Sequence, residues 1–157
     1  MKLVLLLCAG SLVLNAQVIE VSSTSASHGE RAELAISIRL TKDTSIMGLQ
    51  WETTFPTEQM SVEGGGPVAS EAARGAGKSL TCAGKEVPKS GLYSYTCILI
   101  GGQKEITSGP LAVVKFRVSP NARPGETTVR VGNVEAVTKK LQNLHIPDAA
   151  GVIKVKR

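Results

Sequence analysis

Side chains that could act as nucleophiles, general bases or metal ligands are few in this sequence of 157 residues. Its two histidines, His28 and His145, lie on turn-like segments far apart in the chain, and the Gly-x-Ser-x-Gly turn that presents a nucleophilic serine does not occur. The only aspartates are Asp43 and Asp148, which excludes the closely spaced oxygen ligands of an EF-hand calcium loop. Two histidines and three cysteines also leave little material for a zinc site. We therefore expect no catalytic residue, no metal site and no cofactor.

One stretch comes close to a phosphate-binding loop. Gly75-Ala-Gly77-Lys78-Ser79 matches the end of that motif, but the motif also needs a glycine five residues before Gly77, where Ala72 stands. The glutamates of the chain would permit the two carboxylates that hydrolyse a glycosidic bond, but no particular pair is indicated. An enzyme is thus the least favoured class of function, and we expect a non-catalytic protein.

The first 16 residues have the pattern of a secretory signal peptide. Lys2 precedes an uncharged, largely apolar run from Leu3 to Leu14, and Ala16 is a small residue at a plausible cleavage point. The run is too short to cross a membrane as a helix, which takes about 20 residues. We expect residues 1–16 to be removed on export to the periplasm, the cell surface or the extracellular space, which leaves residues 17–157 as one domain.

The charge balance argues against nucleic acid as a partner. The formal net charge is +5, and Lys2 leaves with the signal peptide. The remaining excess is mild and spread out, with its densest spots at Lys139-Lys140 and residues 154–157. A nucleic-acid-binding domain needs a clustered basic face and usually a recognisable motif. We expect these side chains to be solvated surface.

The two cysteines that remain after cleavage, Cys82 and Cys97, predict one disulfide. An even number of cysteines in an exported chain favours pairing. Each cysteine lies in a strand-like segment, and the turn-rich residues 84–91 separate the two segments. Folding the chain about Lys89 and Ser90 sets Cys82 opposite Cys97 in an antiparallel hairpin, at a separation that a disulfide can bridge. The pair is expected to be structural, because catalytic CxxC cysteines are much closer in sequence.

Alternation of apolar and polar residues dominates the chain after residue 17. Because successive side chains of a strand point to opposite faces, each alternating run predicts a half-buried strand. Turn signals separate the runs, so we expect an all-β, two-sheet antiparallel sandwich of about nine strands. Only residues 68–74 hint at a helix. The alternating runs are residues 33–40, 49–55, 111–118, 127–131 and 152–156.

Several segments, taken in order, resemble a cohesin module, the nine-stranded, jelly-roll-like sandwich of cellulosome scaffolds. Gly109-Pro-Leu-Ala-Val-Val-Lys-Phe-Arg-Val118 is the most similar, because it has the family's glycine, small apolar residues and phenylalanine in one strand. Pro124-Gly-Glu-Thr-Thr-Val-Arg-Val131 resembles the proline-glycine turn and strand that follow in cohesins. The resemblance extends over residues 17–157 and implies a jelly-roll-like topology. The other similar segments are residues 48–56, 133–136 and 151–155.

Cohesins bind dockerins, small calcium-loaded modules of carbohydrate-active enzymes, through one exposed sheet face. The resemblance therefore implies a secreted docking module whose partner is a protein, and any calcium would belong to that partner. We expect the binding face among the polar sides of neighbouring strands; the alternative is that these side chains simply face water. Our candidate residues are Gln50, Glu52, Thr54, Lys115 and Arg117.

A carbohydrate-binding module on the same kind of sandwich is the alternative function, with a role in polysaccharide binding or breakdown. Such a module needs exposed aromatic rings for the sugars to stack on. Aromatic residues make up only 3% of the chain, and the candidates are Trp51, Tyr93 and Tyr95. Each of the three is in phase with apolar neighbours of its strand, so we expect all three side chains to point inward.

Overall fold

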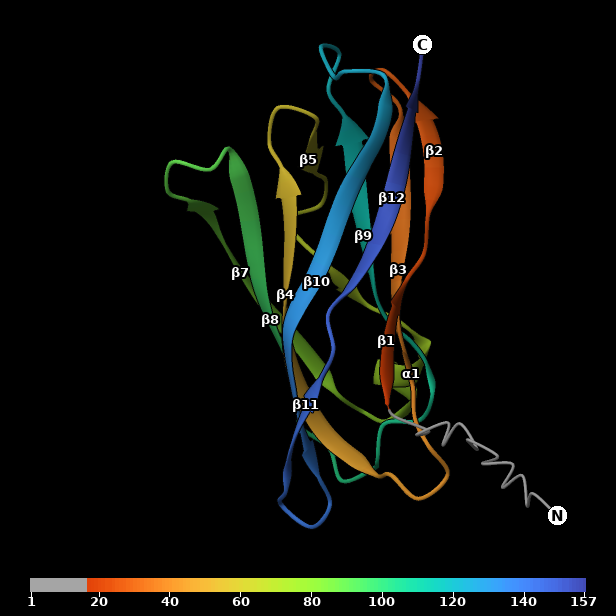
Figure 1. The fold of residues 1–157 in the computed structure, drawn as a ribbon. Coiled ribbons are helices and arrows are strands. Elements are labelled where there is room, and N and C mark those ends of the chain that lie inside the picture. Colours follow the sequence, from red (N-terminus) through yellow and green to blue (C-terminus); the bar gives the residue numbers. More distant parts are fainter. Residues whose placement is uncertain (1–16) are drawn as a thin grey trace, which may run out of the picture.

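Alternating side chains give most strands of this protein one face that packs into a common interior. The computed structural model describes residues 17–157, which form two β-sheets stacked face to face (Figure 1). Burial follows the alternation: in β3 (Arg31–Arg39), every second residue from Ala32 to Ile38 is buried. The predicted all-β, two-sheet sandwich is confirmed. The predicted signal peptide, residues 1–16, lies outside the described residues.

The smaller sheet has five strands. Its centre is the antiparallel pair of β3 and β9 (Gly109–Val118), in whose register Leu34 lies opposite Val114. The outer strands of this sheet also pair antiparallel; they are β1 (Val18–Val21) beside β3, and β5 (Met60–Val62) and β6 (Val68–Ala69) beside β9.

The larger sheet has seven strands. Six of them follow one another across the sheet, and the seventh, β11 (Asn143–Ile146), pairs with the end of β10. In order across the sheet, the six are β2 (Thr24–Ser27), β12 (Ala149–Lys156), β10 (Gly125–Thr138), β4 (Ile46–Pro56), β8 (Leu92–Ile100) and β7 (Ser79–Val87).

Two details differ from the expected sandwich. β2 runs parallel to β12, whereas every other strand pair within residues 17–157 is antiparallel. Residues 17–157 form twelve strands rather than about nine, since several strands are only two to four residues long and too short to show alternation.

The predicted helical segment, residues 68–74, is divided between a strand and a helix. Val68 and Ala69 pair with β9, and helix α1 (Glu71–Gly75) begins only after Ser70. α1 is a single short turn of helix, and within residues 17–157 no helix is long and apolar enough to cross a membrane.

The core lies between the two sheets, and an aromatic contact across the core links one sheet to the other. Phe55 of β4 meets Phe116 of β9 edge to face, with ring centroids 5.1 Å apart. Trp51 is only 1% exposed, which confirms that it points inward. Its indole N–H and the hydroxyl of the neighbouring Thr53 are buried without a hydrogen-bond partner among the described residues.

A disulfide joins the β7–β8 hairpin. Cys82 lies opposite Cys97 in the register, and the two sulfur atoms are bonded, so the predicted pairing is confirmed. Left-handed backbone at Lys89 (φ 57°) and Gly91 (φ 68°) lets the chain reverse where the sequence placed the turn.

Candidate docking face

Three long strands present their side chains next to one another on the outer face of the larger sheet. β4 lies between β8 and β10, and the register places Gln50 opposite Ile98 on one side and opposite Glu135 on the other. Nearer the start of β4, Gly48 lies opposite Val137 of β10. The β8–β4–β10 face, as we call this surface, is therefore built from residues that are distant in the sequence.

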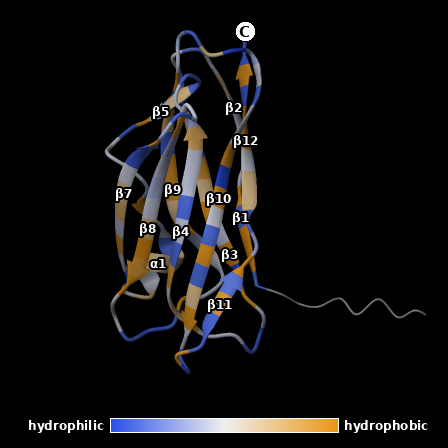
Figure 2. Cartoon of the chain, turned by 60° about the vertical axis from the view of Figure 1, so that its left-hand side comes forward, coloured by the Kyte–Doolittle hydropathy of each residue, from blue (hydrophilic) through white to orange (hydrophobic). Residues whose placement is uncertain are grey.

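Several large apolar side chains on this face are exposed to solvent. Ile98 is 40% exposed, Ile100 57% and Val137 37%. Among the described residues only Val68 and Leu141 are further exposed hydrophobics of this size. Figure 2 shows the hydrophobic end of β8 beside β4. Exposed apolar side chains that gather in one place mark an interaction surface, whereas single ones need no explanation.

The exposed side chains line a groove of about 660 Å³. Gly48 forms part of its floor: a Cβ atom built there would lie 3.1 Å from the carbonyl oxygen of Leu99 and 3.2 Å from Cγ2 of Ile100. The missing side chain keeps the groove open between the two flanking strands. The groove is lined by Met47, Gly48, Leu49, Gln50, Ile98, Ile100, Glu135, Ala136, Val137 and Asn143.

Acidic side chains stand beside the apolar groove, each held by a neighbour. The Glu135 carboxylate lies 2.7 Å from Nδ1 of His145, and Asn133 donates its side-chain amide to Glu52 at 2.9 Å. These contacts fix the carboxylates while leaving oxygen atoms free to accept further hydrogen bonds. The face suits a partner that inserts apolar side chains and places hydrogen-bond donors beside them.

The structure divides the five candidate binding residues between two opposite faces. Gln50, Glu52 and Thr54 lie on the β8–β4–β10 face, where Gln50 lines the groove. Lys115 and Arg117 lie on β9, in the other sheet, and their side chains point away from the core. Alternation places all five outward, but it does not say in which sheet a strand lies.

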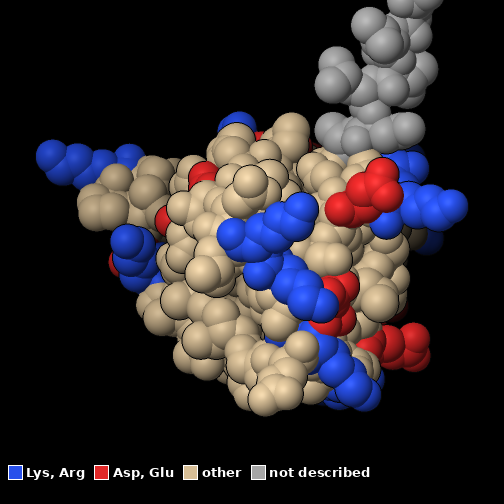
Figure 3. All heavy atoms as spheres, turned by 90° about the horizontal axis from the view of Figure 1, so that it is seen from below, with Lys and Arg blue, Asp and Glu red and all other residues tan. Residues whose placement is uncertain are grey.

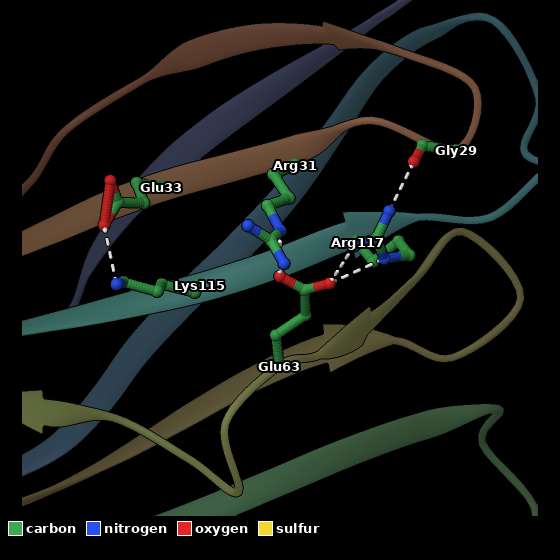
Figure 4. A network of polar contacts seen from close by, with 6 residues as sticks. All are labelled: Gly29, Arg31, Glu33, Glu63, Lys115 and Arg117. Atoms are coloured by element: carbon green, nitrogen blue, oxygen red, sulfur yellow. Dashed lines mark hydrogen bonds and ion pairs between the residues drawn. The ribbon is translucent and has the colours of Figure 1, made fainter.

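Lys115 and Arg117 belong to a network of ion pairs on the outer face of the smaller sheet. Glu63 contacts both Arg31, at 2.7 Å, and Arg117, and Lys115 lies 3.8 Å from Glu33 (Figure 4). Arg117 also donates a hydrogen bond of 2.8 Å to the backbone carbonyl of Gly29. The charges on this face are largely satisfied by one another.

Each of the two histidines contacts an oxygen atom of another segment of the chain. His28 lies 2.8 Å from the backbone carbonyl of Ala122, and His145 pairs with Glu135. Within residues 17–157, no three His, Cys, Asp or Glu side chains gather as a metal site requires.

Basic residues are interspersed with acidic ones at the end of the sandwich that carries the β10–β11 turn (Figure 3). There Nζ of Lys139 lies 2.9 Å from Glu105. Hydrogen bonds from Lys139 and then Ser45 hold the pKa of the Glu105 carboxyl below its usual value. This end is a mixed-charge surface.

Sequence reasoning missed Ile98, Ile100 and Val137. A signal for the first two was present, because residues 97–100 are uninterrupted apolar residues, whereas a half-buried strand should alternate. With Cys97 and Leu99 fully buried, the two isoleucines must point outward. Val137 offers no comparable signal, because it faces the groove only through its pairing with Gly48.

Comparison with solved structures shows that the two sheets form a cohesin-like sandwich, as the sequence resemblance implied. A chain from a type I cohesin–dockerin complex of Clostridium thermocellum matches with a TM-score of 0.74 and 16% identity, covering 90% of this chain and 100% of that one. No protein-family model matches the sequence, and no curated protein matches it.

Two further solved structures share the fold. A non-cellulosomal cohesin from the archaeon Archaeoglobus fulgidus matches with a TM-score of 0.71 and 13% identity, covering 90% of this chain and 91% of its own. A cohesin module of a family 33 glycoside hydrolase from Clostridium perfringens matches with a TM-score of 0.66 and 13% identity, covering 89% and 95%. At these identities the similarity establishes the fold.

Proposed function

We propose that this chain is a secreted, non-catalytic docking module that binds a dockerin-like protein module on the β8–β4–β10 face. The observation that carries the proposal is the convergence of Ile98, Ile100 and Val137 on one groove. Fully desolvated apolar contacts supply most of the affinity of a typical interface, and a polar rim around them adds specificity. Gln50 and Glu52 of the same face would form part of that rim.

The outer faces of the two sheets differ in the free-energy cost of covering them with a partner. The outer face of the smaller sheet carries a ladder of ion pairs, of which the Arg31–Glu63–Arg117 group is the densest part. Desolvating these charges on binding would cost free energy, because each would lose water without gaining a better partner. The β8–β4–β10 face instead offers apolar side chains whose burial is favourable by about 25 cal/mol per Å².

Export is part of the proposal. Residues 1–16 have the signature of a signal peptide, and the Cys82–Cys97 disulfide is of a kind that persists in oxidising compartments. The cohesin of Clostridium thermocellum was solved with a dockerin, and we extend that kind of partner to this chain. No calcium would be held by the module itself.

The test is a pull-down of dockerin modules encoded in the same genome, with and without a calcium chelator. We expect calcium-dependent binding that weakens about tenfold or more in Ile98→Ser and in Ile100→Ser, since each removes a central apolar contact. Val68→Ser is the matched control, because the exposed fraction of Val68 lies between those of Ile98 and Ile100, and Val68 is apolar but lies in the smaller sheet. It should bind like the unaltered protein.

Two results would refute the docking face. One is binding that survives both isoleucine substitutions. The other is binding that is lost on removing charge at Lys115 or Arg117, which would move the interface to the opposite sheet.

A further inference from the structure

A second depression lies on the inner side of the larger sheet, at the opposite end of β4 and β8 from the groove. It has a volume of about 250 Å³ and opens where β5 of the smaller sheet faces the start of β8. It shares no lining residue with the groove on the β8–β4–β10 face. Its lining residues are Phe55, Thr57, Met60, Ser61, Val62, Tyr93 and Tyr95.

Aromatic rings dominate this depression, although the whole chain has only two tyrosines and two phenylalanines. Tyr93 and Tyr95 have ring centroids 5.2 Å apart and planes inclined by 53°. The ring of Phe55 is nearly parallel to that of Tyr95, with an 18° angle and a centroid distance of 6.5 Å. Both tyrosines point inward as predicted, yet they are only partly buried, so their rings form walls of this depression, which we call the aromatic cup.

A glycine of the neighbouring strand lets the two tyrosine rings take these positions. Gly84 lies opposite Tyr95 in the β7–β8 register. A Cβ atom at Gly84 would lie 2.6 Å from Cε1 of Tyr93 and 2.8 Å from Cε1 of Tyr95, far inside van der Waals contact. Any larger residue at this position would displace both rings, so the shape of the cup depends on the missing side chain.

The polar groups of the cup are hydroxyls, and no charged side chain lines it. The floor is apolar, because Phe55 and Met60 are buried, and the exposed Thr57 and Ser61 stand at the rim. Thr57 donates its hydroxyl to the carbonyl of Gly91 at 3.1 Å, which leaves its oxygen free to accept a hydrogen bond.

We propose that this aromatic cup binds a single ring of a neutral saccharide. The apolar C–H face of a sugar ring can lie against the tyrosines while its hydroxyls exchange hydrogen bonds with those of the rim. The absence of charge in the lining disfavours uronic acids and phosphosugars. The cup is smaller than the roughly 300–1,000 Å³ of sites for drug-sized ligands, so it suits one ring at the end of a glycan. A flat aromatic strip along a polysaccharide is not formed, because Trp51 is buried.

The test is calorimetric titration of the purified protein with neutral hexasaccharides of glucose, xylose, mannose and N-acetylglucosamine, and with a galacturonic acid hexamer. We expect at least one neutral member to bind. Tyr93→Leu and Tyr95→Leu should each weaken that binding about tenfold or more, the equivalent of losing one stacked aromatic contact. The conservative variants Tyr93→Phe and Tyr95→Phe retain the ring and should lose less.

Ile100→Ser is the control variant, because Ile100 lines the groove and not the cup, and it should leave saccharide affinity unchanged. Circular dichroism will check that each variant is folded. Absence of binding by every neutral hexamer, preference for the galacturonic acid hexamer, or binding that survives both leucine substitutions would overturn the proposal. Loss of protein-partner binding in Tyr93→Leu would assign the cup to a protein interface instead. Because the docking face is tested with isoleucine variants, failure of one proposal does not imply failure of the other.

Discussion

Cys82 and Cys97 face each other across the β7–β8 ladder, with Cα atoms 4.1 Å apart, and a disulfide joins them. β7 is the edge strand of the larger sheet and pairs only with β8. The bond therefore links a solvent-exposed edge strand to β8, the strand that carries Ile98 and Ile100 of the β8–β4–β10 face. Closing this loop restricts the unfolded chain and stabilises the fold.

Removing the disulfide should destabilise the protein without changing its fold. For the double variant Cys82→Ala/Cys97→Ala we expect the free energy of unfolding to fall by about 3 kcal/mol, the entropy-model value for a loop of this length. Urea denaturation measures the change. The unaltered protein under a reducing agent should show the same loss, and free thiols found in the unreduced, exported protein would contradict the pairing.

Thr53→Val should stabilise the protein. The Thr53 hydroxyl is fully buried and has no hydrogen-bond partner among the described residues, and valine has nearly the same shape without the polar atom. We expect the free energy of unfolding to rise by about 1 kcal/mol. Thr138→Val is the matched control: the Thr138 hydroxyl accepts a hydrogen bond from the backbone N–H of Gln142 at 3.1 Å, so this variant should be destabilised. Destabilisation of both variants would mean that Thr53 has a partner after all.

Glu63→Gln should weaken the smaller sheet. Its carboxylate is 22% exposed and contacts both Arg31 and Arg117, so the substitution leaves two like charges close together. We expect a loss of about 1 kcal/mol in chemical denaturation, and a smaller loss at high salt, where repulsion is screened. Glu33→Gln breaks only the 3.8 Å pair with Lys115 and should cost less. Equal losses of stability in the two variants would show that the Arg31–Glu63–Arg117 group stabilises the fold no more than a single ion pair does.

Alkaline pH should destabilise the fold through Tyr95. Burial, and then the neighbouring Tyr93, raise the pKa of the Tyr95 phenol above its usual value of 10.0. The unfolded chain then ionises at a pH where the folded protein keeps the proton. The free energy of unfolding that the protonated Tyr95 side chain contributes is thus fully present below pH 10. It is lost as the pH rises through the raised pKa of the folded state. In Tyr95→Phe, the free energy of unfolding should decline less steeply above pH 10, and an unchanged slope would contradict this assignment.

Local features of the fold could be predicted because they depend on neighbours in the sequence. The alternation from Leu34 to Ile38 fixes which side chains face the core, and the turn near Lys89 fixes the register that pairs Cys82 with Cys97. Very short strands were missed, since Val68–Ala69 is only two residues long and is held by β9 rather than by its own pattern.

The amino-acid sequence by itself determined the half-buried strands, the disulfide hairpin and the two-sheet class of fold, because period-two burial and turn chemistry act over a few residues. The tertiary structure alone decided which outward residues share a surface. In the structure, Gln50 lies beside Ile98 and Glu135. Lys115 and Arg117 lie in the opposite sheet, and the two tyrosine rings pack against Gly84. These neighbours are set by hydrogen bonding between strands far apart in the chain, and alternation within one strand contains no information about its partner.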